Sequence, residues 1–143
     1  MLFEVSSRKT LSEIDADLKS AAARHQFGIL NVIDLKQAMK SKGVDFDGDC
    51  LVYEVCNPYQ AKRVLEANAS VSTALPCRVS VYGSPGAYRL ATISPTAMMK
   101  MFQSPQALDD TARQAEAPDL FAKPCANGGT GFVVGVQAGT EDR

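Results

Sequence analysis

One junction constrains the fold of this chain more than any other stretch: an apolar strand that passes directly into a capped helix. Residues 50–55, Cys-Leu-Val-Tyr-Glu-Val, have a composition rich in β-branched and aromatic residues, which favours a strand. Asn57 follows as a strong helix N-cap, and Pro58 occupies the first helical position, where a missing amide does no harm. Cys56 therefore stands on the boundary between a predicted strand and a predicted helix.

Hydrophobic patterns predict further elements on both sides of this junction. Thr10 and Glu13 form a capping box ahead of a helix whose apolar residues recur at helical spacing. The segment 77–82 alternates apolar and polar residues as a half-buried strand does, and a Gly-Ser-Pro-Gly turn leads from it into a partner strand. The predicted strands cover residues 2–5, 27–33, 50–55, 77–82 and 88–93; helices are predicted after Thr10, Asp34, Asn57 and Ser94 and at 106–121, and a loop at 69–75.

Length and composition fit one domain followed by a tail. A chain of 143 residues, of which 45% are apolar, can bury an ordinary core without disulfides or a structural metal. We expect the domain to span residues 1–122. Residues 123–143 are rich in glycine around a single short apolar run, which predicts a flexible C-terminal tail.

Charge and hydropathy argue against several classes of partner. The formal net charge is −1 and the pI is near 5.8, whereas broad binding to nucleic acids or membrane surfaces needs clustered Lys and Arg. No apolar run is long enough to predict a membrane-spanning helix, and the first residues lack the pattern of a signal peptide. We therefore expect a cytoplasmic protein with no nucleic-acid or membrane partner, whose cysteines are free thiols.

The candidate site is a pair of cysteines at the ends of two strands. If the strands are antiparallel, the end of the strand that leads to Cys56 and the start of the Cys77 strand lie at the same edge of the sheet. Cys56 also precedes a helix N-terminus, which favours an anion and lowers a thiol pKa. Arg78 could add positive charge, although its side chain should point to the opposite face from Cys77. The candidate ligand-binding residues are Cys56, Asn57, Cys77 and Arg78.

The segment from Gly28 to Met99 resembles the domain-of-unknown-function 302 family. The resemblance is carried by Phe27-Gly28, Ile33-Asp34, Cys56-Asn57-Pro58, Ala61, Leu75-Pro76-Cys77-Arg78-Val79 and Pro95-x-Ala-Met-Met. It implies a two-layer α+β fold, related to the TATA-binding-protein-like folds, with a mainly antiparallel sheet of about five strands packed with helices, and it implies a homodimer. The element order predicted from the residues, β-α-β-(α)-β-(α)-β-β-α, agrees with that fold. The family brings no established activity.

Three interpretations of the cysteine pair are open. Both cysteines can be buried apolar residues of a structural or assembly module, with Asn57 serving only as a cap. The thiols can instead bind a soft metal ion, or a small sulfur-containing or anionic ligand; Cys56 and Cys77 would be the metal ligands, and a second copy of the chain or His25 could add more. In the third interpretation, Cys56 is the nucleophile or redox thiol of an enzyme.

The residues favour binding over catalysis. No evident base accompanies Cys56, because the chain has one histidine, and His25 on an apolar helix face is more often a packed core residue. The methionines at positions 98, 99 and 101 are likewise more often core filling than a metal or binding stripe. We expect a homodimeric binding protein rather than an enzyme. The sequence does not identify its ligand or any cofactor.

Overall fold

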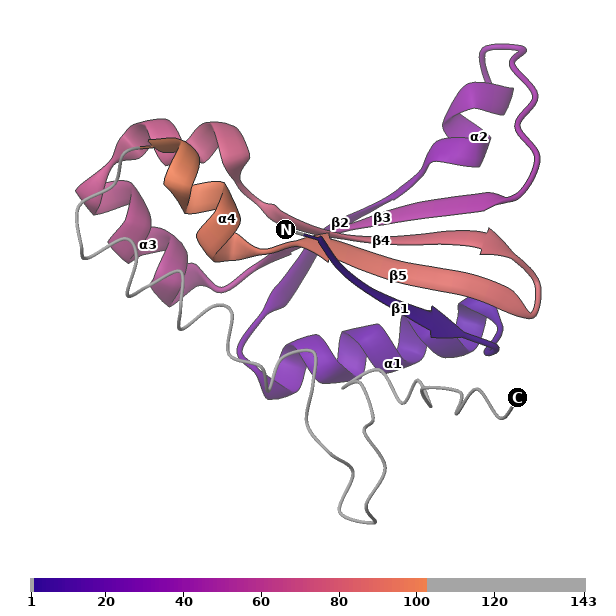
Figure 1. Ribbon diagram of the computed structural model, residues 1–143, viewed down its shortest axis with the longest axis horizontal. Coiled ribbons are helices and arrows are strands. Elements are labelled where there is room, and N and C mark those ends of the chain that lie inside the picture. The colour runs from indigo at the N-terminus through magenta and orange to yellow at the C-terminus, as the bar shows by residue number, and fades with distance from the viewer. Residues whose placement is uncertain (1, 103–143) are drawn as a thin grey trace.

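The computed structural model describes residues 2–102, which form a five-stranded sheet with a helix on one face and further helices at both ends (Figure 1). The helical region predicted at 106–121, the domain boundary predicted at residue 122 and the glycine-rich tail lie outside the described residues. The elements in chain order are β1 (Leu2–Ser7), α1 (Leu11–Arg24), β2 (Gly28–Asp34), α2 (Leu35–Lys40), β3 (Asp49–Cys56), α3 (Pro58–Ala67), η1 (Ala69–Ala74), β4 (Cys77–Ser84), β5 (Ala87–Ile93), α4 (Pro95–Met99) and η2 (Lys100–Phe102).

The sheet has the strand order β1-β5-β4-β3-β2, and neighbouring strands in it are antiparallel. This confirms the predicted α+β class with an antiparallel sheet of five strands. Along the β3–β4 pair, Tyr53 lies opposite Val79 and Val55 lies opposite Cys77. The register therefore brings the last residues of β3 and the first residues of β4 to the same end of the sheet.

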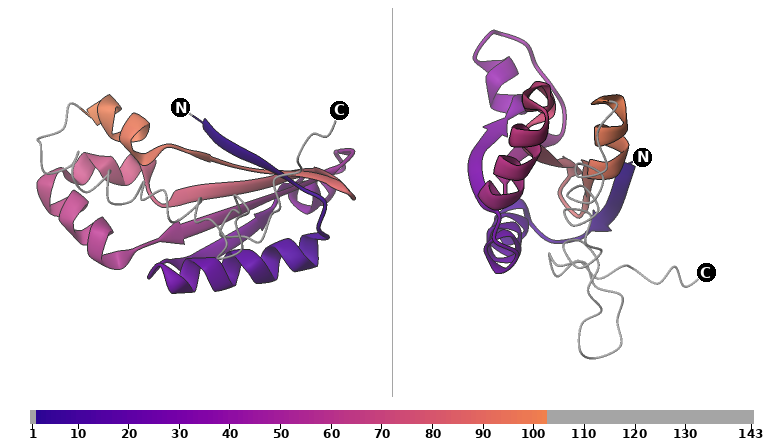
Figure 2. Two further views of the ribbon diagram at one scale, coloured as in Figure 1. Left: turned by 60° about the horizontal axis from the view of Figure 1, so that its bottom comes forward. Right: turned by 90° about the vertical axis from the view of Figure 1, so that its left-hand side faces the viewer.

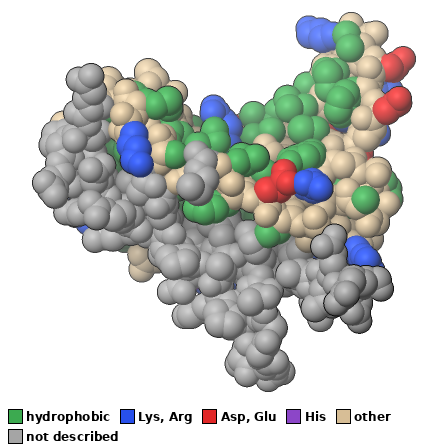
Figure 3. Space-filling view, viewed as in Figure 1, with side chains coloured by type: hydrophobic (Ala, Val, Ile, Leu, Met, Phe, Trp, Pro, Cys, Tyr) green, Lys and Arg blue, Asp and Glu red, His purple; other side chains and the backbone are tan. Residues whose placement is uncertain are grey.

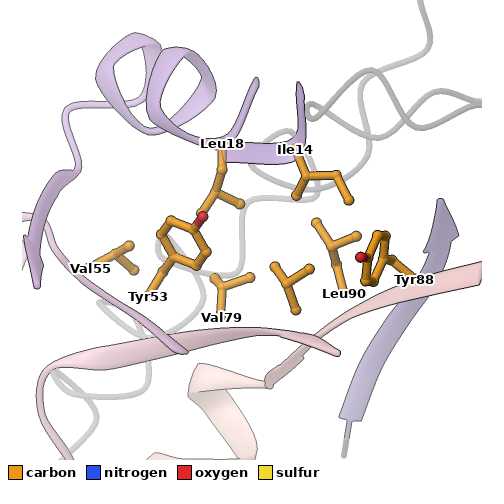
Figure 4. Close-up of a cluster of buried hydrophobic side chains, with 8 residues drawn as sticks. Ile14, Leu18, Tyr53, Val55, Val79, Tyr88 and Leu90 are labelled. Atoms are coloured by element: carbon orange, nitrogen blue, oxygen red, sulfur yellow. The ribbon is translucent and has the colours of Figure 1, made fainter. Parts of the chain in front are cut away.

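Helix α1 covers one face of the sheet and forms the main core with it (Figures 1 and 2). The helix begins at the predicted capping box, in which Thr10 accepts from the Glu13 amide and the Glu13 carboxylate accepts from the Thr10 amide. Its apolar stripe faces the strands (Figure 4). The buried core cluster consists of Ile14, Leu18, Tyr53, Val55, Val79, Val81, Tyr88 and Leu90.

A second, smaller cluster lies where α3, η1 and α4 gather at one end of the sheet (Figure 1). It consists of Val64, Val71, Met98 and Met99. Cys77 packs against this cluster and also against the main core. The start of β4 is therefore the place where the two apolar clusters adjoin.

The predicted loop at 69–75 was wrong, because most of it forms the 3₁₀ helix η1. Asn68 caps this helix with its side-chain oxygen, which accepts from the Ser70 amide at 3.0 Å. Val71 is fully buried and anchors the segment against the smaller cluster. A six-residue element is too short for a helical hydrophobic period, so the pattern that identifies longer helices could not reveal it.

Among the described residues, no helix lies over the centre of the sheet face opposite α1 (Figures 1 and 2). Leu2 and Ile93, which pair across β1 and β5, expose more than half of their side-chain surface on this face. Glu4 of β1 accepts hydrogen bonds from Arg89 on the adjacent strand β5 and from Tyr82 on β4, the next strand along. Figure 3 shows hydrophobic side chains in the hollow between the helical end of the sheet and α2.

The main core predicts a large effect of truncating the α1 stripe. Leu18→Ala removes a side chain that is 4% exposed, and we expect it to lower the free energy of unfolding by about 2–5 kcal/mol in urea titrations. Leu65→Ala on α3 is the matched control, because Leu65 is 37% exposed and its truncation should cost about 1 kcal/mol or less. Equal losses in the two variants would contradict the assignment of the core.

Candidate functional site

The described residues line a partly open cavity of about 50 Å³ at the end of the sheet where β3 passes into α3 and β5 passes into α4. Its walls are almost entirely apolar. Four of the residues that line it carry sulfur: Cys56, Cys77, Met98 and Met99. The other lining residues are Phe27, Val55, Asn57, Gln60, Ala61, Val64, Leu75 and Pro95.

Strand pairing brings the two cysteines to this cavity. Cys56 is the last residue of β3, and Cys77, the first residue of β4, lies opposite Val55. The antiparallel arrangement predicted from the two strand ends is therefore present, and both thiols line the same cavity. Each cysteine is half-buried and neither forms a disulfide.

Asn57 is the helix cap that the sequence predicts, and it also lines the cavity. It is 8% exposed, and its side-chain oxygen accepts from the amides of Tyr59 at 3.1 Å and Gln60 at 3.3 Å. These amides would otherwise be the anion-binding groups of the α3 N-terminus. Because Asn57 occupies them, they are not directed at the Cys56 thiol or at a ligand.

Burial raises the pKa of the Cys56 thiol. The pKa of Cys77 is raised by burial and further by the neighbouring Cys56, and Arg78 opposes this rise. The sequence-based expectation of a lowered thiol pKa at the helix N-terminus was therefore wrong in direction. The physical reason is that desolvation penalises the thiolate while the helix amides are engaged by Asn57. Both thiols carry their protons at neutral pH.

Two other residues considered from the sequence do not line the cavity. Arg78 points to the opposite face of the sheet, where its side chain is 57% exposed and its Nε lies 3.7 Å from Glu54 Oε2. His25 is the half-buried C-cap of α1, and it belongs to neither apolar cluster. The structure thus brings Cys56, Asn57 and Cys77 together without Arg78 or His25.

The sequence interpretation did not connect the methionines with the cysteines. Met98 and Met99 are 9% and 4% exposed, and they are core residues as expected, yet both also line the cavity that Cys56 and Cys77 border. A signal for this was present: Ser94-Pro95 repeats the cap-and-proline pattern of Asn57-Pro58. Antiparallel β4 and β5 return the chain to the end of the sheet at which β4 began, so the two helices start at the same end.

Within residues 2–102, no group of three or more His, Cys, Asp and Glu side chains could hold a metal ion. A zinc site with four such ligands is therefore not formed by these residues alone. None of the described helices is long and apolar enough to cross a membrane.

Comparisons with known proteins agree with this architecture. The family model described as "Domain of unknown function DUF302" matches residues 3–118. The crystal structure of an uncharacterized conserved protein DUF302 from Bacillus stearothermophilus is 30% identical, and the match covers 83% of this chain and 91% of that one with a TM-score of 0.76. No curated protein matches the chain.

The raised pKa of Cys56 predicts slow alkylation at neutral pH. Iodoacetamide reacts with the thiolate, so the rate should rise with pH and reach half its maximum at a higher pH than for an ordinary exposed thiol. Peptide mapping by mass spectrometry reports the rate at Cys56 alone, and the same cysteine in urea-unfolded protein is the control. A half-maximal pH below that of the unfolded control would restore the activated-thiol hypothesis.

Proposed function

Because the chain belongs to the DUF302 family, whose description states no activity, we propose a function from the cavity itself: the protein binds a soft metal ion through the thiols of Cys56 and Cys77. The observation that carries this proposal is that two thiols from different strands line one small, almost wholly apolar cavity. Thiolates are the protein ligands that soft metal ions prefer.

The size of the cavity favours an ion over a larger ligand. Its volume of about 50 Å³ is far below the roughly 300–1,000 Å³ of typical small-molecule pockets. It is nevertheless several times larger than the roughly 10–15 Å³ that one water molecule needs.

The lining disfavours an anionic ligand. The amides at the start of α3 are engaged by Asn57, and Arg78 lies on the other face of the sheet. An anion in the cavity would lose its hydration without gaining a charged partner, which is costly in an apolar environment. A metal ion differs, because it forms coordinate bonds to sulfur and is neutralised by the thiolates that it creates.

The lining also favours binding over catalysis. A cysteine nucleophile needs a lowered pKa or an adjacent base, and burial raises the pKa of both thiols. The described lining residues include no His, Asp, Glu or Lys that could accept the thiol proton. A metal ion needs no such base, because it displaces the proton directly to solvent as it binds.

Titration with Cd²⁺ tests this function, since Cd²⁺ is soft, has no redox chemistry under these conditions, and forms thiolate bonds that absorb in the ultraviolet. In a Cys125→Ser background under reducing conditions, we expect binding of one ion per chain. Cys56→Ser and Cys77→Ser should each weaken binding at least about tenfold. Cys50→Ser is the matched control, because Cys50 lies at the opposite end of β3 and does not line the cavity.

The pH dependence of the same titration gives the number of protons displaced. Both thiols are protonated at neutral pH, so affinity should rise with pH by about 100-fold per unit below the thiol pKa values if Cd²⁺ displaces two protons. Affinity that is unchanged in the Cys56→Ser, Cys77→Ser double variant would reject the proposed function.

We also propose that two copies of the chain associate through the sheet face opposite α1, over whose centre no described helix lies. Exposed Leu2 and Ile93 supply apolar surface there. The charged groups of this face are paired within the chain, Glu4 with Arg89 and Glu54 with Arg78, so a second copy would meet it without net repulsion. A face of this kind suits the two-fold self-pairing that is commonest among homodimers.

Light scattering after size-exclusion chromatography tests the dimer. We expect the parent protein to have the mass of two chains and Ile93→Glu to have the mass of one, because the interface would bury the new carboxylate without a charged partner. Tyr59→Glu is the control, since Tyr59 is 71% exposed and lies on α3 rather than on a strand of this face. A monomeric parent, or a dimeric Ile93→Glu variant, would exclude this interface.

A further inference from the structure

The cavity is built by two junctions of the same design. At the end of β3, Asn57 caps α3 and Pro58 occupies its first position. At the end of β5, the Ser94 side chain accepts from the Ala97 amide at 3.3 Å, and Pro95 begins α4. The first junction places a thiol immediately ahead of its helix, and the second places two thioethers one turn into its helix.

The methionines both pack in the core and border the cavity. Met is an unbranched, flexible side chain that usually closes irregular gaps in a core. Here Met98 and Met99 are buried in the smaller cluster, and a space of about 50 Å³ nevertheless stays open beside them and the two thiols. A space lined by four sulfur-bearing side chains is large enough for an ion that bonds to sulfur.

The kind of sulfur narrows the choice of ion. Thioether and thiolate ligands together favour monovalent copper, whereas zinc is usually held by thiolate and imidazole, and calcium and magnesium by oxygen. The described lining residues include no imidazole or carboxylate. A cavity with these walls therefore offers little to a hard cation.

Charge balance in an apolar cavity also favours a monovalent ion. One thiolate neutralises a monovalent ion, and every further thiolate adds a negative charge that is costly to bury. Thioethers add bonds without adding charge. Their presence next to the thiols allows a monovalent ion to be coordinated by several sulfurs in a site that stays neutral.

We propose that Met98 and Met99, together with Cys56 and Cys77, form an all-sulfur site for monovalent copper. This inference rests on the proposed soft-ion function of the two thiols and adds both the identity of the ion and the ligands from α4. Binding is an exchange: Cu⁺ enters as a thiol proton leaves to solvent, and no electron is transferred.

Competition with a chromogenic Cu⁺ chelator tests the ligands from α4. In the full chain with Cys125→Ser, under anaerobic reducing conditions, Met98→Leu together with Met99→Leu should weaken Cu⁺ binding at least about tenfold. Leu has nearly the volume of Met and removes only the sulfur. Affinity for Cd²⁺ should change less than about twofold. Met101→Leu is the control, because Met101 is 71% exposed and does not line the cavity.

The outcomes separate the two proposals. Thiol-dependent Cd²⁺ binding with Cu⁺ affinity equal in the parent and the double Leu variant overturns the copper site and leaves the proposed function intact. Absence of thiol-dependent Cd²⁺ binding in the parent overturns both. Equal weakening of Cu⁺ and Cd²⁺ in the Leu variant would assign the methionines a packing role and also reject the inference.

A second measurement does not depend on the folding of a variant. Selenomethionine-labelled parent protein loaded with Cu⁺ should show a copper neighbour in X-ray absorption at the selenium edge. The same measurement on labelled Met101→Leu protein should keep that neighbour. A selenium edge without copper in the loaded parent overturns the site.

Discussion

The pairing of β3 with β4 is the interaction on which the rest of the described structure depends. Val55 lies opposite Cys77, and Tyr53 lies opposite Val79, so that alternate residues of both strands face α1. Since side chains alternate with a period of two, a slip of one residue in β4 would turn Cys77 outward and carry Arg78 into the core. Changing this register would expose the apolar residues that pack against α1, so the register is strongly favoured. The same register places Cys56 and Cys77 at one cavity.

Several elements are evident in the sequence because their chemistry is local. Two helix caps, the capping box of Thr10 with Glu13 and the Asn57-Pro58 cap, bond to helix amides only a few residues away. A short stretch of sequence is therefore enough to predict each of them. The strand at 77–82 shows its alternation directly. The resemblance to a known family supplied the fold, including the antiparallel sheet, which local patterns do not specify; the family match now covers residues 3–118.

The features that the sequence did not reveal are those set by distant parts of the chain. Met98 and Met99 line the cavity only because the β4–β5 hairpin returns the chain to its starting end, and their local pattern indicates core packing alone. The pKa of the Cys56 thiol is raised by burial, which depends on the elements that pack around it. The sequence indicates only that a helix N-terminus follows the thiol. In the folded chain, the Asn57 side chain accepts hydrogen bonds from the amides of Tyr59 and Gln60, and burial raises the thiol pKa.

The two cap-and-proline junctions have a consequence for how such a site can vary. The position of the cavity is set by backbone features, namely strand pairing and the starting points of α3 and α4, and none of these requires sulfur. Its chemistry is set by a few side chains placed just before or one turn after those starting points. The position of the cavity and its ligand selectivity are therefore set by different residues. Substituting the lining residues would change which ligand the cavity binds while the fold around it stays the same.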